Sequence, residues 1–171
     1  NEQALELIVD AIEKSNLKPG KDLVICLDVA ANELINEKGE YSIQSKNYSS
    51  VEDNIDYYKK LTSNYPIKSI EDPFAEEDWS SWNKITNEIG KNIQIVGDDL
   101  FVTNSKRLSK GIKEKSANCI LVKPNQIGTL TETLEVVSMA KAANWSRTEW
   151  CHFSWNWKPR RGFMWWSPMA W

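Results

Sequence analysis

Apolar and polar residues alternate along most of the chain in blocks of two kinds. Short, nearly continuous apolar runs are typical of strands that are covered on both faces, and they occur at residues 23–27, 67–70, 93–96 and 119–122. Longer segments carry apolar residues three or four positions apart, which is typical of amphipathic helices. They predict helices over residues 1–16, about 50–63, 78–88, 104–115 and 129–143, the second of which Ser49 or Ser50 can cap.

Strand and helix therefore alternate four times, which predicts an α/β fold with a parallel sheet and right-handed helical crossovers. Four such βα units make either half of a (β/α)8 barrel of the TIM type or a small open α/β sheet. An Asn-Glu-Lys-Gly turn at residues 36–39 lies between Leu34-Ile35 and the alternating Tyr41 and Ile43. This pattern predicts a small hairpin insertion after the first strand.

The last part of the chain departs from this pattern. Residues 145–171 hold seven of the nine tryptophans and show no clear period, a composition that is unusual for a natural globular segment. We therefore place residues 1–144 in the barrel and treat residues 145–171 as an anomalous tail. The tail is hypothesised to be frame-shifted or disordered, because Trp157 to Arg160 can be encoded by codons that spell Glu-Thr-Glu in another frame.

Composition narrows the class of protein. A net charge of -3 over 171 residues argues against a general nucleic-acid binder, although a basic aromatic tail surface (Arg147, Lys158, Arg160, Arg161) is an alternative interpretation of the tail. Cys26 and Cys119 lie in apolar runs and Cys151 makes their number odd, which favours buried thiols in a reducing compartment, the cytoplasm. No apolar run is long enough to span a membrane, and the first residues lack the pattern of a signal peptide.

Four chemically active residues end the four predicted strands: Asp28, Glu71, Asp98 and Lys123. The carboxyl ends of parallel strands meet at one face of the sheet, where α/β folds place their sites. Three carboxylates offer the hard oxygen ligands that suit Mg²⁺. The alternative is that each carboxylate caps the helix that follows its strand.

Lys123 is followed by Pro124, which places its ammonium group at the mouth of the sheet. Beside a bound cation its pKa is expected to fall toward that of a general base, and the alternative is a strand-end lysine that reaches solvent. Glu76, Glu77 and Asp78 are expected to cap a helix, and Asp99 is expected to support the site from the opposite face of its strand.

Longer motifs around these residues carry a family resemblance. The segments SIEDPFAEEDW, VGDDLFVTN and LVKPNQIGTLTET resemble enolase, the phosphopyruvate hydratase, and LDVAANEL resembles the family strand that bears the first metal ligand. The resemblance covers residues 2–145. It implies that Asp28, Glu71 and Asp98 are Mg²⁺ ligands and that Lys123 is the base that takes the carbon-2 proton of 2-phosphoglycerate, leading to phosphoenolpyruvate in glycolysis. It also implies a homodimer for the complete enzyme.

The resemblance also implies that parts of the enzyme lie outside these residues: an amino-terminal domain, the early barrel strands with a general-acid glutamate, and a late strand with a second lysine. His152 and Ser154 correspond to a family His-Arg-Ser motif that binds substrate, with Phe153 in place of the arginine. We therefore expect this chain to be inactive alone. The alternative function is a non-catalytic fragment that binds a partner or is displayed at a surface.

Overall fold

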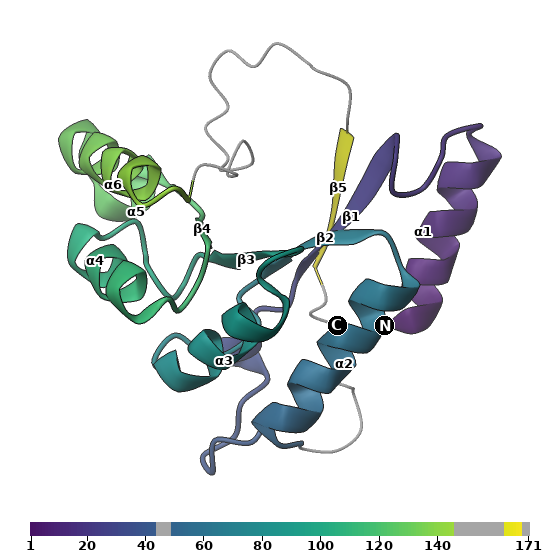
Figure 1. Ribbon diagram of the computed structural model, residues 1–171, viewed down its shortest axis with the longest axis horizontal. Coiled ribbons are helices and arrows are strands. Elements are labelled where there is room, and N and C mark those ends of the chain that lie inside the picture. The colour runs from purple at the N-terminus through teal and green to yellow at the C-terminus, as the bar shows by residue number, and fades with distance from the viewer. Residues whose placement is uncertain (44–48, 146–162, 169–171) are drawn as a thin grey trace.

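The computed structural model describes residues 1–43, 49–145 and 163–168, and for the last of these segments it describes the backbone alone. The described chain forms one parallel sheet with helices beside it (Figure 1). No helix within these ranges is both long and apolar enough to cross a membrane.

Among the described residues the sheet has five strands in the order β4-β3-β2-β1-β5, and neighbouring strands pair in parallel. Its strands are, in chain order, β1 (Leu23–Asp28), β2 (Ile67–Glu71), β3 (Gln94–Gly97), β4 (Cys119–Ile120) and β5 (Phe163–Pro168). The first four follow one another across the sheet, so sequence neighbours are spatial neighbours. This is the strand order expected of successive units of a barrel.

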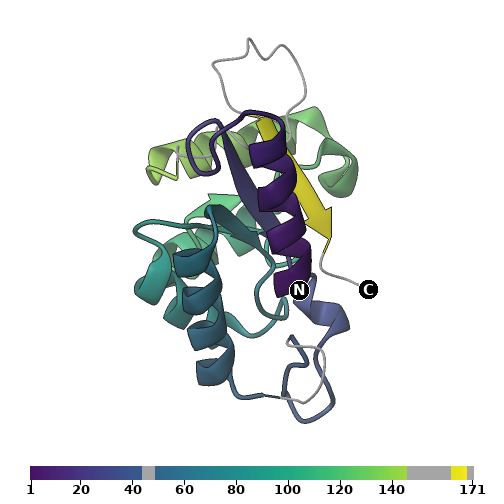
Figure 2. The same cartoon turned by 90° about the vertical axis from the view of Figure 1, so that its right-hand side faces the viewer.

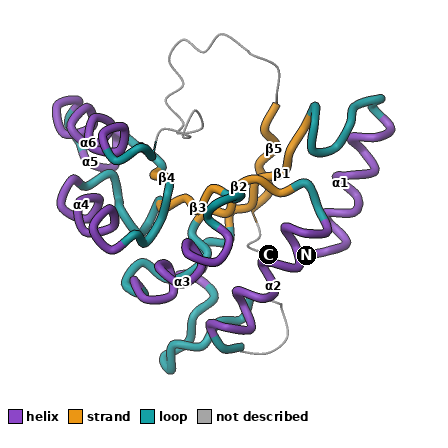
Figure 3. The backbone as a smooth tube through the Cα atoms, viewed as in Figure 1, coloured by secondary structure: helices purple, strands orange, loops and turns teal. Residues whose placement is uncertain are grey.

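The helices form an arc around one side of the sheet (Figures 1 and 3). They are α1 (Glu2–Lys14), α2 (Val51–Asn64), α3 (Trp79–Ile89), α4 (Ser105–Glu114), the single-turn α5 (Pro124–Ile127) and α6 (Leu130–Ala142). Four polar side chains cap α2, α3, α4 and α6 by accepting backbone N–H groups: Ser50, Asp78, Asn104 and Thr129. Ser50 and Asp53 form a reciprocal capping box, which fixes where α2 begins.

Alternate strand residues face opposite sides of the sheet, and the helices cover one of these sides (Figure 1). Ile25, Leu27 and Ile95 belong to the large core that the sheet shares with the helices. Val96, Cys119 and Leu121 form a separate buried cluster. Burial of most strand residues on both faces, with Val24 and Gln94 partly exposed, accounts for the nearly continuous apolar runs in the sequence.

The segment after β1 contains the predicted hairpin in a reduced form. Ile35 pairs with Tyr41 and Tyr41 with Ser49 as antiparallel bridges. The buried Tyr41 hydroxyl donates to Asp78 Oδ2 (2.9 Å) and accepts from Ala75 N (3.1 Å), so the hairpin is tied to the loop that leads into α3. Figure 2 shows this excursion below the sheet, beside α2.

The structure confirms four βα units and adds elements that the pattern does not predict. The short 3-10 helix η1 (Ala31–Glu33) and α5 follow strand ends. Strand β4 ends at Ile120, earlier than the expected residue 122, although Leu121 N still donates to Gly97 O (3.0 Å). In the tail, β5 pairs with β1 from Leu23 to Asp28. The apolar pattern of the tail did not predict this pairing.

Candidate metal centre

The four strand-end residues that the sequence singles out lie at the same end of the sheet. Asp28 and Glu71 are the last residues of β1 and β2 and are paired with each other in register. Asp98 directly follows β3, and Lys123 lies between β4 and α5. The parallel sheet therefore brings together side chains that are far apart in the sequence.

The carboxylates at this end form two overlapping groups. Oxygen atoms of Asp28, Glu71 and Asp72 lie within 4.8 Å of one another, and so do oxygen atoms of Asp72, Asp98 and Asp99. Asp72 belongs to both groups and therefore stands between the predicted ligands. The two groups together are called the carboxylate cluster below.

Burial and mutual repulsion shape the electrostatics of the cluster. Burial, reinforced by the charges of Asp28 and Asp72, raises the pKa of Glu71 to about 8. Burial also raises the pKa of Asp72 to about 7, against the hydrogen bonds that its carboxylate accepts from Asp99 and Asp98. The pKa of Asp28 is raised mainly by burial as well. The raised pKa values show that negative charge is crowded here, and hard oxygen donors fit a divalent cation such as Mg²⁺, which would relieve the repulsion.

Lys123 brings a positive charge to the carboxylate cluster. Its Nζ forms an ion pair with Asp98 Oδ2, and the Lys123 side chain is 42% exposed while that of Asp98 is 9% exposed. Burial lowers the pKa of Lys123, but the hydrogen bond and the charge of Asp98 outweigh it, so the net pKa is raised. We expect the pKa of Lys123 to fall when a cation is bound, because Asp98 would then stabilise the lysine charge less. This fall stays a prediction.

Helix capping is not the role of the three predicted ligands. The caps of α2, α3, α4 and α6 are the side chains given above. Asp28 Oδ1 accepts a local hydrogen bond from Ala30 N (3.1 Å), before η1. Asp78 caps α3 as expected, whereas its neighbour Glu77 forms an ion pair with Arg107. Asp99 accepts a hydrogen bond from Asn32 Nδ2 (2.9 Å), which links two of the loops around the cluster.

Three residues in or beside the cluster were not predicted from the sequence to belong to the site. Asp72 follows Glu71, and strand alternation alone would direct it away from the site, but its φ of 42° turns the chain there. The Thr103 hydroxyl accepts from Lys123 N (2.9 Å) and donates to Gln126 Oε1 (3.0 Å), so it holds the backbone of Lys123. Gln126 lies inside the KPNQIGT motif, which is the one signal that pointed to it.

Some predicted residues cannot be placed. His152 and Ser154, the predicted substrate-binding residues, lie outside the described residues, as do Cys151 and the basic residues of the tail. Cys26 and Cys119 are buried, as expected.

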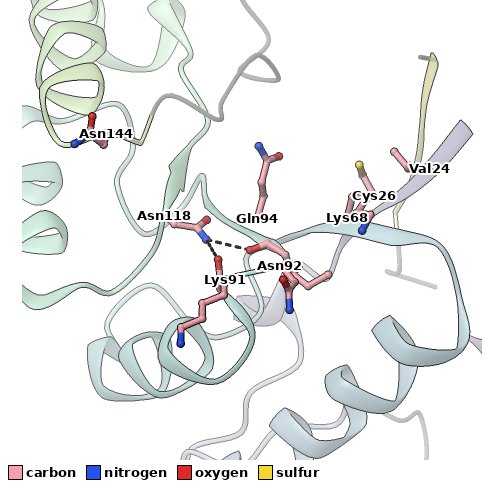
Figure 4. A pocket seen from close by; sticks show the side chains of 10 residues that line it. Val24, Cys26, Lys68, Lys91, Asn92, Gln94, Asn118 and Asn144 are labelled. Carbon is pink, nitrogen blue, oxygen red and sulfur yellow. Dashed lines mark hydrogen bonds between the residues drawn. The ribbon is translucent and has the colours of Figure 1, made fainter. Parts of the chain in front are cut away.

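A cavity of about 590 Å³ lies at the other end of the sheet (Figure 4). Its lining includes Val24, Lys68 and Gln94, which stand near the starts of their strands, and none of the cluster residues. Beside it, Asn118 Nδ2 donates to Gly90 O (2.8 Å) and to Ile93 O (3.0 Å). In barrels the amino-terminal end of the strands serves stability, so this cavity is not the candidate site.

Fold and site together define an α/β barrel protein with an acidic cluster and a lysine at the carboxyl ends of its strands. Residues 1–154 match the family described as "Enolase, C-terminal TIM barrel domain". The chain is also 57% identical over 141 residues to "Enolase" of Pelagibacter ubique (strain HTCC1062), which covers 82% of this chain and 33% of that protein. The chain belongs to the enolase family. It spans about a third of the length of this relative.

Proposed function

We propose that the chain carries the metal-binding and proton-abstracting part of an enolase active site, which dehydrates 2-phosphoglycerate to phosphoenolpyruvate. The observation that supports it is the convergence of Asp28, Glu71, Asp98 and Lys123 at one end of the sheet. Family membership supplies the substrate class. The cluster residues then have distinct tasks in this reaction.

Asp28, Glu71 and Asp98 would hold Mg²⁺. When bound, Mg²⁺ supplies Lewis-acid stabilisation of the charge that develops on the substrate carboxylate. Asp28 and Glu71 end strands and Asp98 directly follows one, so the three carboxylates would hold the cation at a fixed place relative to the sheet. Gln126, whose Nε2 approaches Asp98 Oδ1 at 3.5 Å, stands beside the third ligand.

Lys123 would take the proton from carbon 2 of the substrate. Its backbone is held by Thr103, while its side chain is partly exposed and can reach a substrate atom. A base must be neutral, so its ion pair with Asp98 has to weaken before the reaction. The glutamate that acts as general acid in the family has no counterpart among the residues with a family-like motif, so only the first half of the reaction is within reach of this chain.

The test is exchange of the carbon-2 proton of 2-phosphoglycerate in D₂O, followed by NMR with Mg²⁺ present. We expect slow exchange that requires Mg²⁺ and is lost on adding a chelator, with no phosphoenolpyruvate above background. Lys123→Ala should reduce the exchange to background, whereas Asp53→Asn, in the exposed capping box of α2, should not change it.

Exchange that survives both Lys123→Ala and the chelator would contradict the proposed roles. Absence of exchange together with absence of Mg²⁺ binding would favour the non-catalytic, partner-binding alternative. Measurable phosphoenolpyruvate formation that Lys123→Ala abolishes would instead show that the expected inactivity of this chain is wrong.

The remaining family properties are part of the same proposal. They are a small-molecule substrate, a homodimer for the complete enzyme and a cytoplasmic location. The buried free thiol of Cys26 supports a reducing compartment.

A further inference from the structure

Asp72 occupies the junction between three strand ends. It directly follows β2, is 5% exposed and has a left-handed φ of 42°. Its backbone N donates to Val96 O in β3 (3.0 Å), and its backbone O accepts from Ala31 N after β1 (3.2 Å). The peptide groups of Asp72 therefore connect the ends of β1, β2 and β3.

The carboxylate of Asp72 adds a second set of bonds. Its Oδ1 accepts from Asp98 N (3.0 Å) and its Oδ2 accepts from Asp99 N (3.1 Å). Each oxygen thus holds one of two consecutive backbone N–H groups, at the point where the chain leaves β3. The two hydrogen bonds together fix both the position and the rotation of this peptide segment.

The same segment carries a predicted ligand. The side-chain oxygens of Asp98 contact Lys123 and Gln126, whereas the hydrogen bond from Asp98 to the Asp72 carboxylate comes from its backbone N. Asp72 therefore contacts Asp98 through the backbone and leaves its side chain available. Because Glu71 directly precedes Asp72, one residue couples the position of the second ligand to that of the third.

We propose that Asp72 is a positioning residue, which sets Asp98 relative to Glu71 before a cation binds, and is not itself a metal ligand. The identity of the cation in this inference rests on the proposed function, whereas the hydrogen bonds of Asp72 do not depend on it. Each of its carboxylate oxygens already accepts a backbone N–H group from the segment that carries Asp98, which favours orientation of Asp98 over direct ligation of the cation. Groups that orient ligands typically change metal affinity 10- to 100-fold when they are replaced.

Asp72→Asn is the informative variant because it keeps the size of the side chain. Its amide nitrogen would face a backbone N–H, so one of the two hydrogen bonds is lost. We expect the amides of residues 98 and 99 in the metal-free protein to exchange with solvent about 10-fold faster by NMR, with the core amides of Ile95 and Ile120 unchanged. Calorimetry with Mg²⁺ should give an affinity about 10- to 100-fold weaker at unchanged stoichiometry. The control Asp53→Asn should leave both measurements unchanged.

Two results would overturn the proposal. Unchanged exchange at residues 98 and 99 with loss of one bound Mg²⁺ would make Asp72 a ligand, and no change in either measurement would leave it without a role. Should Asp72→Asn fail to fold, NMR on the unaltered protein can measure the scalar coupling across each hydrogen bond, between the amides of Asp98 and Asp99 and the carboxyl carbon of Asp72. Absence of this coupling refutes the proposal. Failure of the proposed function would appear instead as an unaltered protein that binds no Mg²⁺ but keeps these amides protected.

Discussion

Glu71 illustrates how strongly the site depends on the surroundings of single residues. Its ordinary pKa of 4.5 is raised to about 8, first by burial and then by the negative charges of Asp28, Asp72 and Asp98. The folded chain thus binds the Glu71 proton more tightly than the unfolded chain does. Its contribution to stability is fully present below pH 4.5 and is lost as the pH rises through about 8.

Glu71→Gln should remove this part of the pH dependence in the absence of metal. At pH 9 we expect the variant to be more stable than the unaltered protein by on the order of 2 kcal/mol, because a neutral amide escapes the repulsion. At pH 4.5 the two should be nearly equal. Urea unfolding in the presence of a chelator at several pH values measures the difference.

The exposed Glu135 in α6 offers the matched control, since Glu135→Gln should leave the pH profile unchanged. If the stability of Glu71→Gln and of the unaltered protein ran parallel from pH 4.5 to pH 9, the carboxylate of Glu71 would not be in the repulsive environment described.

At the scale of elements, helix α4 is positioned against the loop that carries Asp98. Phe101 in this loop is fully buried, and its ring lies 5.5 Å from that of Trp145 and 6.2 Å from that of Trp79, centroid to centroid. Gly111 of α4 lies against the same ring, because a Cβ at this position would stand 2.4 Å from Phe101 Cε1. The glycine therefore allows close approach of the helix to the loop.

Gly111→Ala should destabilise the protein although alanine is the better helix former by about 1 kcal/mol. The added methyl group has no room beside a ring that is packed on its other sides, and overpacking of this kind costs about 1–3 kcal/mol. We expect a net loss of stability in thermal unfolding. Ser109→Ala, at an exposed position of the same helix, should be neutral or slightly stabilising, and a Gly111→Ala protein as stable as Ser109→Ala would contradict the close approach.

At the scale of the whole molecule, an open sheet has two edges, and unpaired strand edges promote association. Strand β5 covers the edge of β1 over the register from Leu23–Phe163 to Asp28–Pro168. The place that a neighbouring barrel strand would take beside β1 is therefore filled by a segment from the tail.

A chain that ends after residue 162 should associate more than a chain that ends after residue 168. Loss of β5 leaves the N–H and C=O groups along β1 unpaired, and pairing with a second molecule would satisfy them. Sedimentation velocity over a range of concentrations measures the difference between the two truncated chains, which share the absence of residues 169–171. Equal sedimentation with equal stability would mean that β5 does not protect the edge.

The repeating part of the fold could be predicted because burial dictates it. Strands with both faces covered must be apolar throughout, and helices with one covered face must show a period near 3.6, so β1, β2 and β3 and the longer helices were visible in the pattern. Helix α5 and strand β5 were not. The first is a single turn that follows Pro124, and the second is placed by pairing with β1 rather than by a pattern of its own.

By itself, the sequence determined the residue types, the order of the units and the positions of Asp28, Glu71, Asp98 and Lys123 at strand ends, because each of these depends on local pattern and on motifs. The tertiary structure decided which groups meet: Lys123 with Asp98, Thr103 with the backbone of Lys123, and Asp72 with two consecutive amides. The physical reason is that a left-handed turn and hydrogen bonds between distant strands leave no periodic trace in the sequence. They nevertheless set the geometry and the pKa values on which the candidate metal centre depends.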